Sequence, residues 1–481
     1  MFTKEQLFEN GKTTPEALID TILLLQEQVQ DATSRITQLE EQIAKNSRNS
    51  SKPPSSDGLK GADPKPKPKS LRKKTNQKQG GQEGHTGHTL EQTETPDHTI
   101  HLPVTTCSCC TDLTNVQATN LDCRQVFEIP EPKLEVFEYQ SEIKICPNCG
   151  QTNKGQFPEG VNSSVQYGPR FRGMLVYMQN QHFMPAARLS QMVSDLYGTA
   201  PSVATILNAS SRIHDNLASF EEAIVETLSN SKILHVDESG LRVVKKLYWL
   251  HSASTETVTF YGVHEKRGAL ATDHFNILPQ FSGRLIHDFW KPYFKYDCDH
   301  GLCNAHHLRE LVFLFEQQGQ LWAKDMFELL LDMNVFINEQ NMQLSSEQME
   351  PWIKWYREII ADGWAGDPLP KKLPKKKKRG RRAKTKAQNL LVRLGEFEES
   401  VLAFFHDASV PFTNNLAEQD IRMIKVRQKI SGCFRSVHGA EYFARIRSYL
   451  STARKQGRNI LDSITDAING TPFHPAVSFS S

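Results

Sequence analysis

Apolar residues in residues 18–43 recur at alternating steps of three and four, the spacing of one side of a helix. Ile or Val occupies every seventh position from Ile22, and Leu fills most positions between them. This heptad pattern favours a parallel two-stranded coiled coil, so residues 1–45 are predicted to be a dimerisation helix. The alternative is an amphipathic helix packed on its own domain. The stripe comprises Leu18, Ile22, Leu25, Val29, Ala32, Ile36, Leu39 and Ile43.

Short apolar runs with alternation predict a sheet in residues 229–316. The run that begins at Ile233 ends on Asp237, where the core gives way to a polar surface. Two alternating or aromatic-rich runs follow, KLYWLHSAS and VTFYGVH, with a short polar turn between them. We therefore expect three consecutive antiparallel strands, a helix near residues 268–278 and a further strand that leads into Asp288.

Helical spacing dominates two other stretches. Residues 166–228 are predicted to form consecutive helices, and the one that ends at Gly198 leads into another, like a helix-turn-helix. DNA recognition and simple packing of a small bundle are both compatible with this pattern. Residues 317–404 are predicted to be a helical insertion with a flexible basic loop at 371–386. That loop contains no acids, which favours phosphate binding.

Residues 405–470 are predicted to complete the core that residues 229–316 begin. Ala417 and Ile421 lie at helical spacing, so Glu418 falls near the start of a helix, one residue after Ala417. Asp420 points to a different side of the same helix.

The segment of residues 46–96 is rich in Ser, Pro, Lys and Gly, with a basic stretch at Lys65–Lys74. Such a composition cannot bury a core and predicts a disordered linker. It either neutralises DNA phosphates non-specifically or serves only as a solubilising spacer. Residues 471–481 are expected to be a frayed tail.

Two Cys-x-x-Cys pairs in residues 97–165 predict a zinc-binding module. A strand-rich segment, Val126–Ile145, separates them. Four thiolates leave no open coordination position, so this site is structural. The predicted ligands are Cys107, Cys110, Cys146 and Cys149. Alternative ligands are Cys109, His98 and His101.

Asp237, Asp288 and Glu418 give three acids in the order Asp, Asp, Glu, two on strands and one on a late helix. Such a trio can hold two divalent cations roughly 4 Å apart, one at the attacking and one at the leaving oxygen of a phosphodiester. Oxygen ligands suit the hard cations Mg²⁺ or Mn²⁺. For each acid alone, a turn, cap or surface ion-pair role is the alternative.

The motifs around these acids resemble the insertion-sequence-66 family of DDE transposases. The resemblance rests on NNLAEQDIRMIKVRQKISGCFRS, HVDESGLRV, HDFWKPYF and, near the start, NSRNSSKPPSSDG. It implies a ribonuclease-H-like catalytic core, a zinc-binding module and a DNA cut-and-join reaction. By position, Asp237, Asp288 and Glu418 match the three acids of the family. Gln419 departs from the pattern, which usually has Arg after the Glu, and puts a DNA contact in doubt.

Basic residues around the predicted site are candidate DNA contacts, with pairing to surface acids as the alternative. Cys303 and His306 also invite a metal interpretation, but one Cys with two His makes a poor zinc site. A helix whose His and Arg face the cleft is therefore favoured. The candidate DNA-binding residues are Arg422, Lys425, Arg427, Lys429, His306 and Arg309.

Composition adds limits to this picture. The chain has 481 residues, 38% of them hydrophobic and 23% charged, which fits about three domains of a soluble protein. The net charge is only +2, but the bases are clustered, so local basic patches matter more than the total. There is no run long and apolar enough for a membrane span, and Met1–Asn10 carries acids where a leader would be basic and apolar. We expect a cytoplasmic, nucleoid-associated protein.

Together these patterns predict a multidomain α+β protein: a coiled coil, a zinc-binding module, a helical DNA-binding region and a ribonuclease-H-like α/β core with a helical insertion. The expected function is metal-dependent cleavage of transposon ends and strand transfer into target DNA. DNA, a second copy of the chain and possible accessory proteins are the expected partners. The alternatives are a non-catalytic architectural protein on a decayed core, and a nuclease that cuts without joining.

Overall fold

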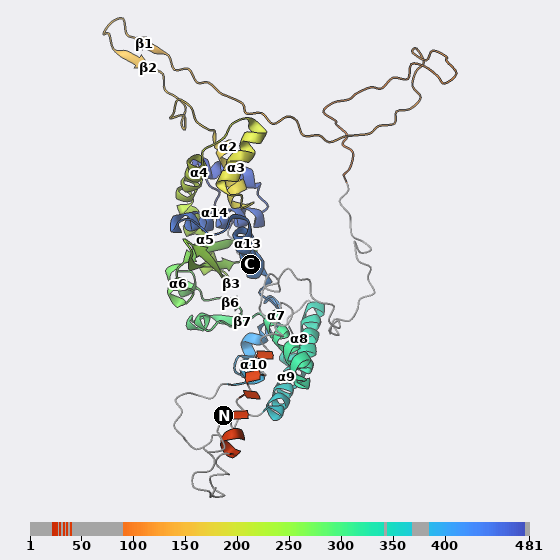
Figure 1. Ribbon diagram of the computed structural model, residues 1–481, viewed down its shortest axis with the longest axis vertical. Coiled ribbons are helices and arrows are strands. Elements are labelled where there is room, and N and C mark those ends of the chain that lie inside the picture. The colour runs from red at the N-terminus through yellow and green to blue at the C-terminus, as the bar shows by residue number, and fades with distance from the viewer. Residues whose placement is uncertain are drawn as a thin grey trace, which may run out of the picture. The chain divides into compact units, whose positions relative to one another are not determined.

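The computed structural model describes residues 90–340, 344–367 and 384–476, and helical residues at 22–26, 28–29, 32–33, 35–36 and 39–40 (Figure 1). Contacts divide the chain into two units, one of Gly61–Glu138 and one of Met1–Lys60 with Tyr139–Ser481. Residues 46–89 of the linker predicted at 46–96, and residues 371–383 of the basic loop predicted at 371–386, lie outside the described residues.

A five-stranded mixed sheet organises the larger unit. Its strand order is β5-β4-β3-β6-β7. The pairs β3–β4 and β4–β5 are antiparallel, whereas β6 and β7 run parallel to β3. The strands are β3 (Ile233–Val243), β4 (Lys246–Ser254), β5 (Thr259–His264), β6 (Arg284–His287) and β7 (Asp299–Leu302).

The three antiparallel strands and the strand before Asp288 occur in the predicted order. The predicted helix between them is shorter, because α6 (Ala269–His274) gives way to the 3-10 helix η3 (Leu278–Gln280). A second 3-10 helix, η4 (Lys291–Lys295), follows Asp288. The short strand β7 was not predicted, since its sequence, DHGL, has no apolar alternation.

Alternation along β3 sends its side chains to two different cores. Leu241 and Val243 pack with Ile421 and Ile424 of α13 (Asn415–Ser431). Leu234 and Val236 pack on the other core, which includes α5 (Ala218–Ser229). The odd-numbered residues of β3 therefore face α13, and the even-numbered residues face away from it.

The helix α14 (Val437–Lys455) covers the edge of the sheet at β5. Ser448 Oγ accepts a hydrogen bond from Tyr261 N at 2.8 Å, and Thr452 Oγ1 accepts one from Thr259 N at 3.1 Å. Edge strands expose unpaired backbone amides, and here side chains of α14 satisfy them. The next helix, α15 (Ile460–Asn469), was not predicted; it packs on α2.

The helices before the sheet form a bundle, as the spacing predicted. They are α2 (Pro169–Asn180), α3 (Ala186–Tyr197), α4 (Val203–Asn216) and α5. The helix α3 ends at Gly198, whose φ of 69° is left-handed, and Ser202 caps α4 by accepting from Thr205 N at 3.1 Å. Buried Leu175, Leu189, Val193 and Ile206 form a small core of their own.

Helices between β7 and α13 share a separate apolar core that reaches the sheet at Ile286 and Leu302. Helices occupy most of the described part of residues 317–404, the stretch predicted to be a helical insertion. The helices are α7 (Asn304–Gln318), α8 (Leu321–Gln340), α9 (Ser346–Gly366), α10 (Lys386–Glu396), α11 (Glu398–Val401) and α12 (Ala403–His406).

The predicted strand-rich segment Val126–Ile145 is wrong for most of its length. Only β1 (Ile143–Ile145), paired with β2 (Thr152–Lys154), is a strand within it. The side chains of Val126, Phe127 and Ile129 are exposed, so the apolar run packs against nothing that would hold it as a strand.

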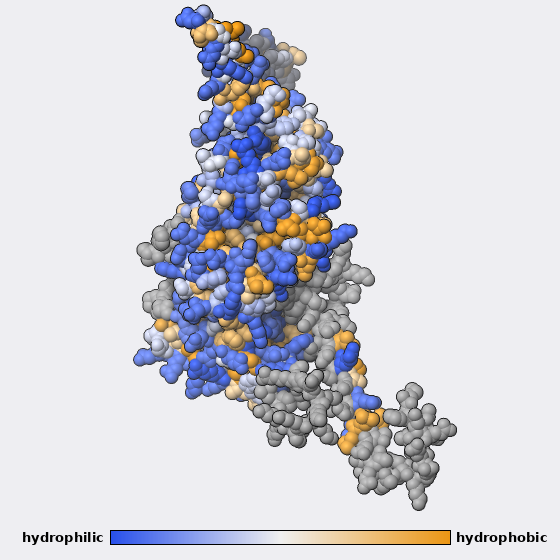
Figure 2. All heavy atoms as spheres, turned by 90° about the vertical axis from the view of Figure 1, so that its left-hand side faces the viewer, coloured by the Kyte–Doolittle hydropathy of each residue, from blue (hydrophilic) through white to orange (hydrophobic). Residues whose placement is uncertain are grey.

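Among the described residues no helix is long and apolar enough to cross a membrane. The face drawn in Figure 2 is mostly hydrophilic, with apolar side chains in scattered patches.

Candidate active site

Asp237 and Asp288 lie at corresponding positions of two neighbouring parallel strands. The register of β3 and β6 pairs His235 with Ile286, and each acid lies two residues further along its chain. Asp237 is still within β3, whereas Asp288 directly follows β6. Parallel strands bring these ends to one edge of the sheet, so the two acids meet there.

The helix α13 is tied to this edge through Asn414, the buried residue that precedes it. Asn414 Nδ2 donates to Val236 O at 2.8 Å, and Asn414 Oδ1 lies 2.9 Å from His235 Nδ1. Asn414 does not cap the helix with its side chain. Its contacts with β3 instead fix the first turn of α13, which carries Glu418, to the strand that carries Asp237.

The electrostatics of Asp237 show how closely the acids gather. Burial raises the pKa of Asp237 well above its usual range, and the charges of Glu238, Asp288 and Glu418 raise it further. Only one hydrogen bond, from Glu238 N at 2.8 Å, opposes this. A cation favours the charged forms of such half-buried, interacting carboxylates, and oxygen donors suit Mg²⁺ or Mn²⁺. The residues present therefore fit a hard divalent cation.

Glu238 is adjacent to Asp237 but points to the opposite face of the sheet. Arg267 donates to Glu238 Oε1 from Nε at 2.8 Å, and the Tyr293 hydroxyl donates to Oε2 at 2.5 Å. The guanidinium of Arg267 lies between two indole rings, 4.9 Å from Trp249 and 4.3 Å from Trp290. Arg267 is thus engaged in the fold.

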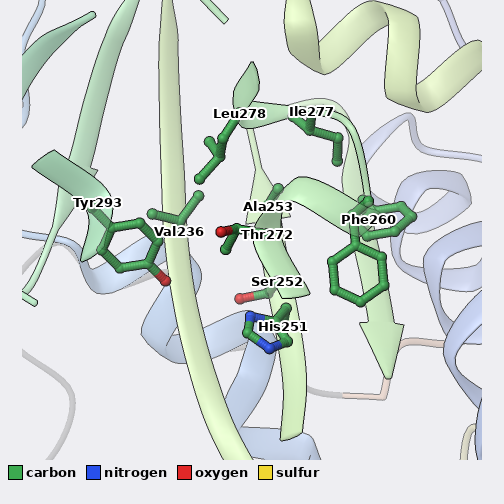
Figure 3. A pocket seen from close by; sticks show the side chains of 10 residues that line it. Val236, His251, Ser252, Ala253, Phe260, Thr272, Ile277, Leu278 and Tyr293 are labelled. Atoms are coloured by element: carbon green, nitrogen blue, oxygen red, sulfur yellow. The ribbon is translucent and has the colours of Figure 1, made fainter. Parts of the chain in front are cut away.

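A small cavity lies on this second face of the sheet (Figure 3). Its walls include Val236, Ala253 and Phe260, with His251 and Tyr293 at its polar side. Its volume of about 30 Å³ has room for about two water molecules, so it is too small for a substrate. Asp237 lies on the other face of the sheet, toward α13.

The turn after Asp288 has an unusual backbone. Phe289 adopts a φ of 69°, a left-handed conformation that is strained for a bulky residue. Its ring packs edge-on against Phe397 at 4.9 Å and lies 4.5 Å from the Arg393 guanidinium. Arg393 also pairs with Glu310 of α7 at 2.9 Å. The insertion thereby supports the turn that aims Asp288.

Cys303 and His306, at the start of α7, face Glu418 across the site. Cys303 Sγ and His306 Nδ1 each lie 3.8 Å from Glu418 Oε1. Among the described residues, these three form the group whose ligating atoms converge, all within 4.8 Å of one another. Burial lowers the pKa of His306, and it raises the pKa of Cys303 to about 11, so the thiol is protonated. Cys303 was treated as part of a poor metal site because its partner Glu418 is distant in sequence.

The predicted basic contacts differ in how far they are engaged within the protein. Lys425 Nζ donates to Gly240 O at 2.9 Å. Arg427 donates to Gly432 O and stacks on Phe434 at 3.3 Å, and burial lowers its pKa to about 10. Arg422 and Lys429 are exposed and form no ion pair with any described residue. Arg309 is half-buried on α7, three residues after His306.

Asp420 has a structural role away from the three acids. Lys455 donates to its Oδ2 at 2.7 Å, and Thr259 Oγ1 donates to the same oxygen at 3.1 Å. A cavity of about 200 Å³ lies beside it, between α13 and α14. Asp420 therefore ties α13 to α14 and β5.

The two Cys-x-x-Cys pairs each lie in a tight hairpin. Cys107 and Cys110 lie between the bridged residues Thr106 and Asp112, in the unit Gly61–Glu138. Cys146 and Cys149 lie between β1 and β2, in the other unit. Backbone hydrogen bonds from Cys149 and Asn148 lower the pKa of Cys146, as in a knuckle whose amides face a sulfur. The four-cysteine zinc site remains a prediction.

Comparison with known proteins gives the class of this chain. A family model described as "Transposase IS66 family" matches residues 164–442, from the helical bundle through the sheet to α14. A second model, a family of unknown function, matches residues 8–91. No curated protein matches the chain.

A match over more than half of the chain shows the family. The protein belongs to the IS66 transposase family, as its motifs indicated, and its partner is therefore DNA.

Proposed function

We propose that the chain is a DDE transposase that cleaves transposon ends and joins them to target DNA with Asp237, Asp288 and Glu418 as its metal-binding acids. The single observation that carries this proposal is the placement of Asp237 and Asp288 at corresponding positions of two neighbouring parallel strands, where the charges of Asp288 and Glu418 act on Asp237. The strand order β5-β4-β3-β6-β7, antiparallel at one side and parallel at the other, is that expected of a ribonuclease-H-like core.

The three acids would hold Mg²⁺ or Mn²⁺. Bound there, such ions activate the attacking oxygen and stabilise the leaving oxygen of the phosphodiester. The chain itself supplies the rigid edge of the sheet, the Asn414 tether that fixes Glu418, and the Phe289 turn that aims Asp288. His306, 3.8 Å from Glu418, would donate a hydrogen bond to an oxygen of the scissile phosphate. No covalent intermediate with the protein is part of the scheme.

Exposed basic residues follow Glu418 along α13. Arg422 and Lys429 are available to contact DNA phosphates, while Lys425 and Arg427 hold α13 to its neighbours. The helices α2–α5 and the cysteine hairpins are the remaining candidates for DNA-end recognition. The Cys107–Cys110 pair and the Cys146–Cys149 pair each offer two thiolates that suit a structural Zn²⁺.

The proposal is tested by cleavage of a labelled duplex that carries the terminal repeat of the flanking element, with Mg²⁺, with Mn²⁺ and with chelator. Wild type is compared with Asp237→Asn and Glu418→Gln, which keep the shape of each side chain but remove its charge. We expect cleavage to fall by at least ~10³-fold in both variants, because each loses a cation ligand. Glu399→Gln, at an exposed acid of α11, is the control and keeps full activity.

Asp237→Asn has a second readout. Since burial and three like charges raise the pKa of Asp237, the variant should unfold at a higher temperature than wild type in chelator. Added Mg²⁺ should stabilise wild type and not the variant. Cleavage that persists in Asp237→Asn would refute the site, and DNA binding without cleavage in wild type would favour the non-catalytic alternative.

A further inference from the structure

The junction between β7 and α7 brings together three ligating atoms of different kinds. Cys303, just before α7, and His306, one helical turn later, contribute a sulfur and a ring nitrogen. Glu418 of α13 contributes a carboxylate oxygen, and all three atoms lie within 4.8 Å of one another. This set differs in character from the all-oxygen set that Asp237 and Asp288 provide.

The spacing of the three atoms is close to that of a tetrahedral metal site. Zn–S bonds of about 2.3 Å and Zn–N or Zn–O bonds of about 2.0–2.1 Å place ligand atoms roughly 3.3–3.6 Å apart at tetrahedral angles. The two measured separations from Glu418 Oε1 are both 3.8 Å. A contraction of a few tenths of an ångström would bring each of these two separations to the tetrahedral value, and Cys303 Sγ and His306 Nδ1 lie within 4.8 Å of each other.

Cys303 and His306 differ in their hydrogen bonds, and Cys303 Sγ donates a weak one to Glu418 Oε1 at 3.8 Å. His306 Nδ1 is buried and has no hydrogen-bond partner among the described residues. At 3.8 Å its separation from Glu418 is too long for a hydrogen bond. Cys303 is buried, and its sulfur accepts a hydrogen bond from Asn414 N at 3.2 Å. Outer hydrogen bonds of this kind orient and stabilise metal-bound thiolates.

We propose that Cys303, His306 and Glu418 form a binding site for Zn²⁺, with the fourth coordination position open. A thiol, an imidazole and a carboxylate suit zinc, whereas Mg²⁺ binds oxygen and would not select the sulfur. Binding forms a Zn–S bond and breaks the S–H bond of Cys303, whose proton passes to solvent. No electron is transferred.

The site shares Glu418 with the proposed carboxylate centre, and this consequence rests on the proposed function. Zn²⁺ held by α7 and α13 competes with a hard cation for the same carboxylate. Zinc binding itself depends only on the three side chains and requires no DNA and no cleavage.

The test uses Co²⁺ as a spectroscopic substitute for zinc and the full-length chain. Because the cysteine hairpins also offer thiols, the background chain carries serine at Cys107, Cys109, Cys110, Cys146 and Cys149, all outside the buried cores. Cys303→Ser and His306→Gln are then added separately. Cys298→Ser is the matched control, since Cys298 is a half-buried free thiol of the same sheet region that belongs to no ligand cluster among the described residues.

We expect the background chain to bind one Co²⁺ with a charge-transfer band of a single thiolate. Cys303→Ser should lose the band, His306→Gln should weaken binding by about tenfold or more, and Cys298→Ser should change neither. Circular dichroism without metal confirms that each variant folds, and if Cys303→Ser does not fold, His306→Gln decides. The absence of a band in the background chain, or unchanged binding in the folded variants, would overturn the proposal.

These outcomes are separate from those of the cleavage assay. Mg²⁺-dependent cleavage without Co²⁺ binding would leave the proposed function intact and refute the zinc site. Co²⁺ binding in a chain that never cleaves DNA would support the zinc site and refute the proposed function.

Discussion

Asp237 and Glu238 are neighbouring carboxylates that the sheet separates into different roles. Alternation sends Asp237 toward α13 and Glu238 toward Arg267 and Tyr293. Glu238 has an ion pair and two donors for its charge, so it stabilises the turn before α6 and the η4 segment. Asp237 has one backbone donor and three acidic neighbours, which is the environment of a cation ligand.

The buried side chain of His251 should make the stability of the protein depend on pH. Burial lowers its pKa from 6.5 to about 4, because the folded protein disfavours the charged ring. Between pH 4 and pH 6.5, His251 is therefore protonated in the unfolded chain and neutral in the folded protein. The stability contributed by neutral His251 is complete above pH 6.5 and is lost as pH falls from 6.5 toward 4, by about 1.4 kcal/mol per pH unit.

His251→Gln should remove this share of the acid sensitivity. The measurement is the free energy of unfolding in urea at pH 7 and at pH 5 for wild type and variant. The exposed His438→Gln serves as control and should keep the wild-type difference between the two pH values. An equal loss of stability in His251→Gln and wild type would contradict the assignment.

At the scale of elements, the position of α13 depends on a single side chain. Asn414 is 1% exposed and bonds to two consecutive residues of β3, His235 and Val236. Asn414→Ala leaves both partners buried without their hydrogen bonds, and we expect it to cost about 2–3 kcal/mol. Mn²⁺ affinity should fall as well, because Glu418 is no longer fixed beside Asp237.

The exposed neighbour Asn415 provides the matched control for this prediction. Asn415→Ala removes the same amide from the same end of α13 without touching β3. Urea denaturation and calorimetric titration with Mn²⁺ distinguish the two variants. If both lose stability and metal affinity alike, then the tether is not what holds Glu418.

Elements with strong periodicity were predictable, and short or tertiary features were not. The strands β3, β4 and β5 and the bundle α2–α5 follow from alternation and helical spacing. Each candidate acid could be named from its position after an apolar run or near a helix start. The strand β7, the tether of Asn414 and the left-handed Phe289 could not, because each depends on contacts between residues far apart in the chain.

The contacts of the basic residues on α13 were unpredictable for the same reason, because they depend on residues far apart in the chain. A run of bases on α13 predicts DNA contacts, yet Arg427 stacks on Phe434 and Lys425 bonds to a strand carbonyl. Spacing along a helix indicates which side chains share a face. It does not reveal whether that face meets solvent or another element.

The predicted N-terminal helix, residues 1–45, concerns how copies of the whole chain associate with one another. Its described apolar residues Val29 and Ile36 are 64% and 56% exposed, at positions where a coiled coil would bury them. We propose that this stripe pairs two copies of the chain, which would bring two catalytic sites to two transposon ends. Val29→Lys with Ile36→Lys should therefore convert a dimer to a monomer and raise the dissociation constant by more than ~100-fold.

Leu23→Lys with Leu24→Lys is the matched control for this last prediction. These leucines are also exposed, but they lie outside the heptad stripe, so the same change of charge and hydrophobicity should leave the dimer intact. Light scattering of the full-length variants over a range of concentrations measures the outcome. If the variant with Val29→Lys and Ile36→Lys remains a dimer, or if both variants lose the dimer equally, the stripe does not specify the pairing.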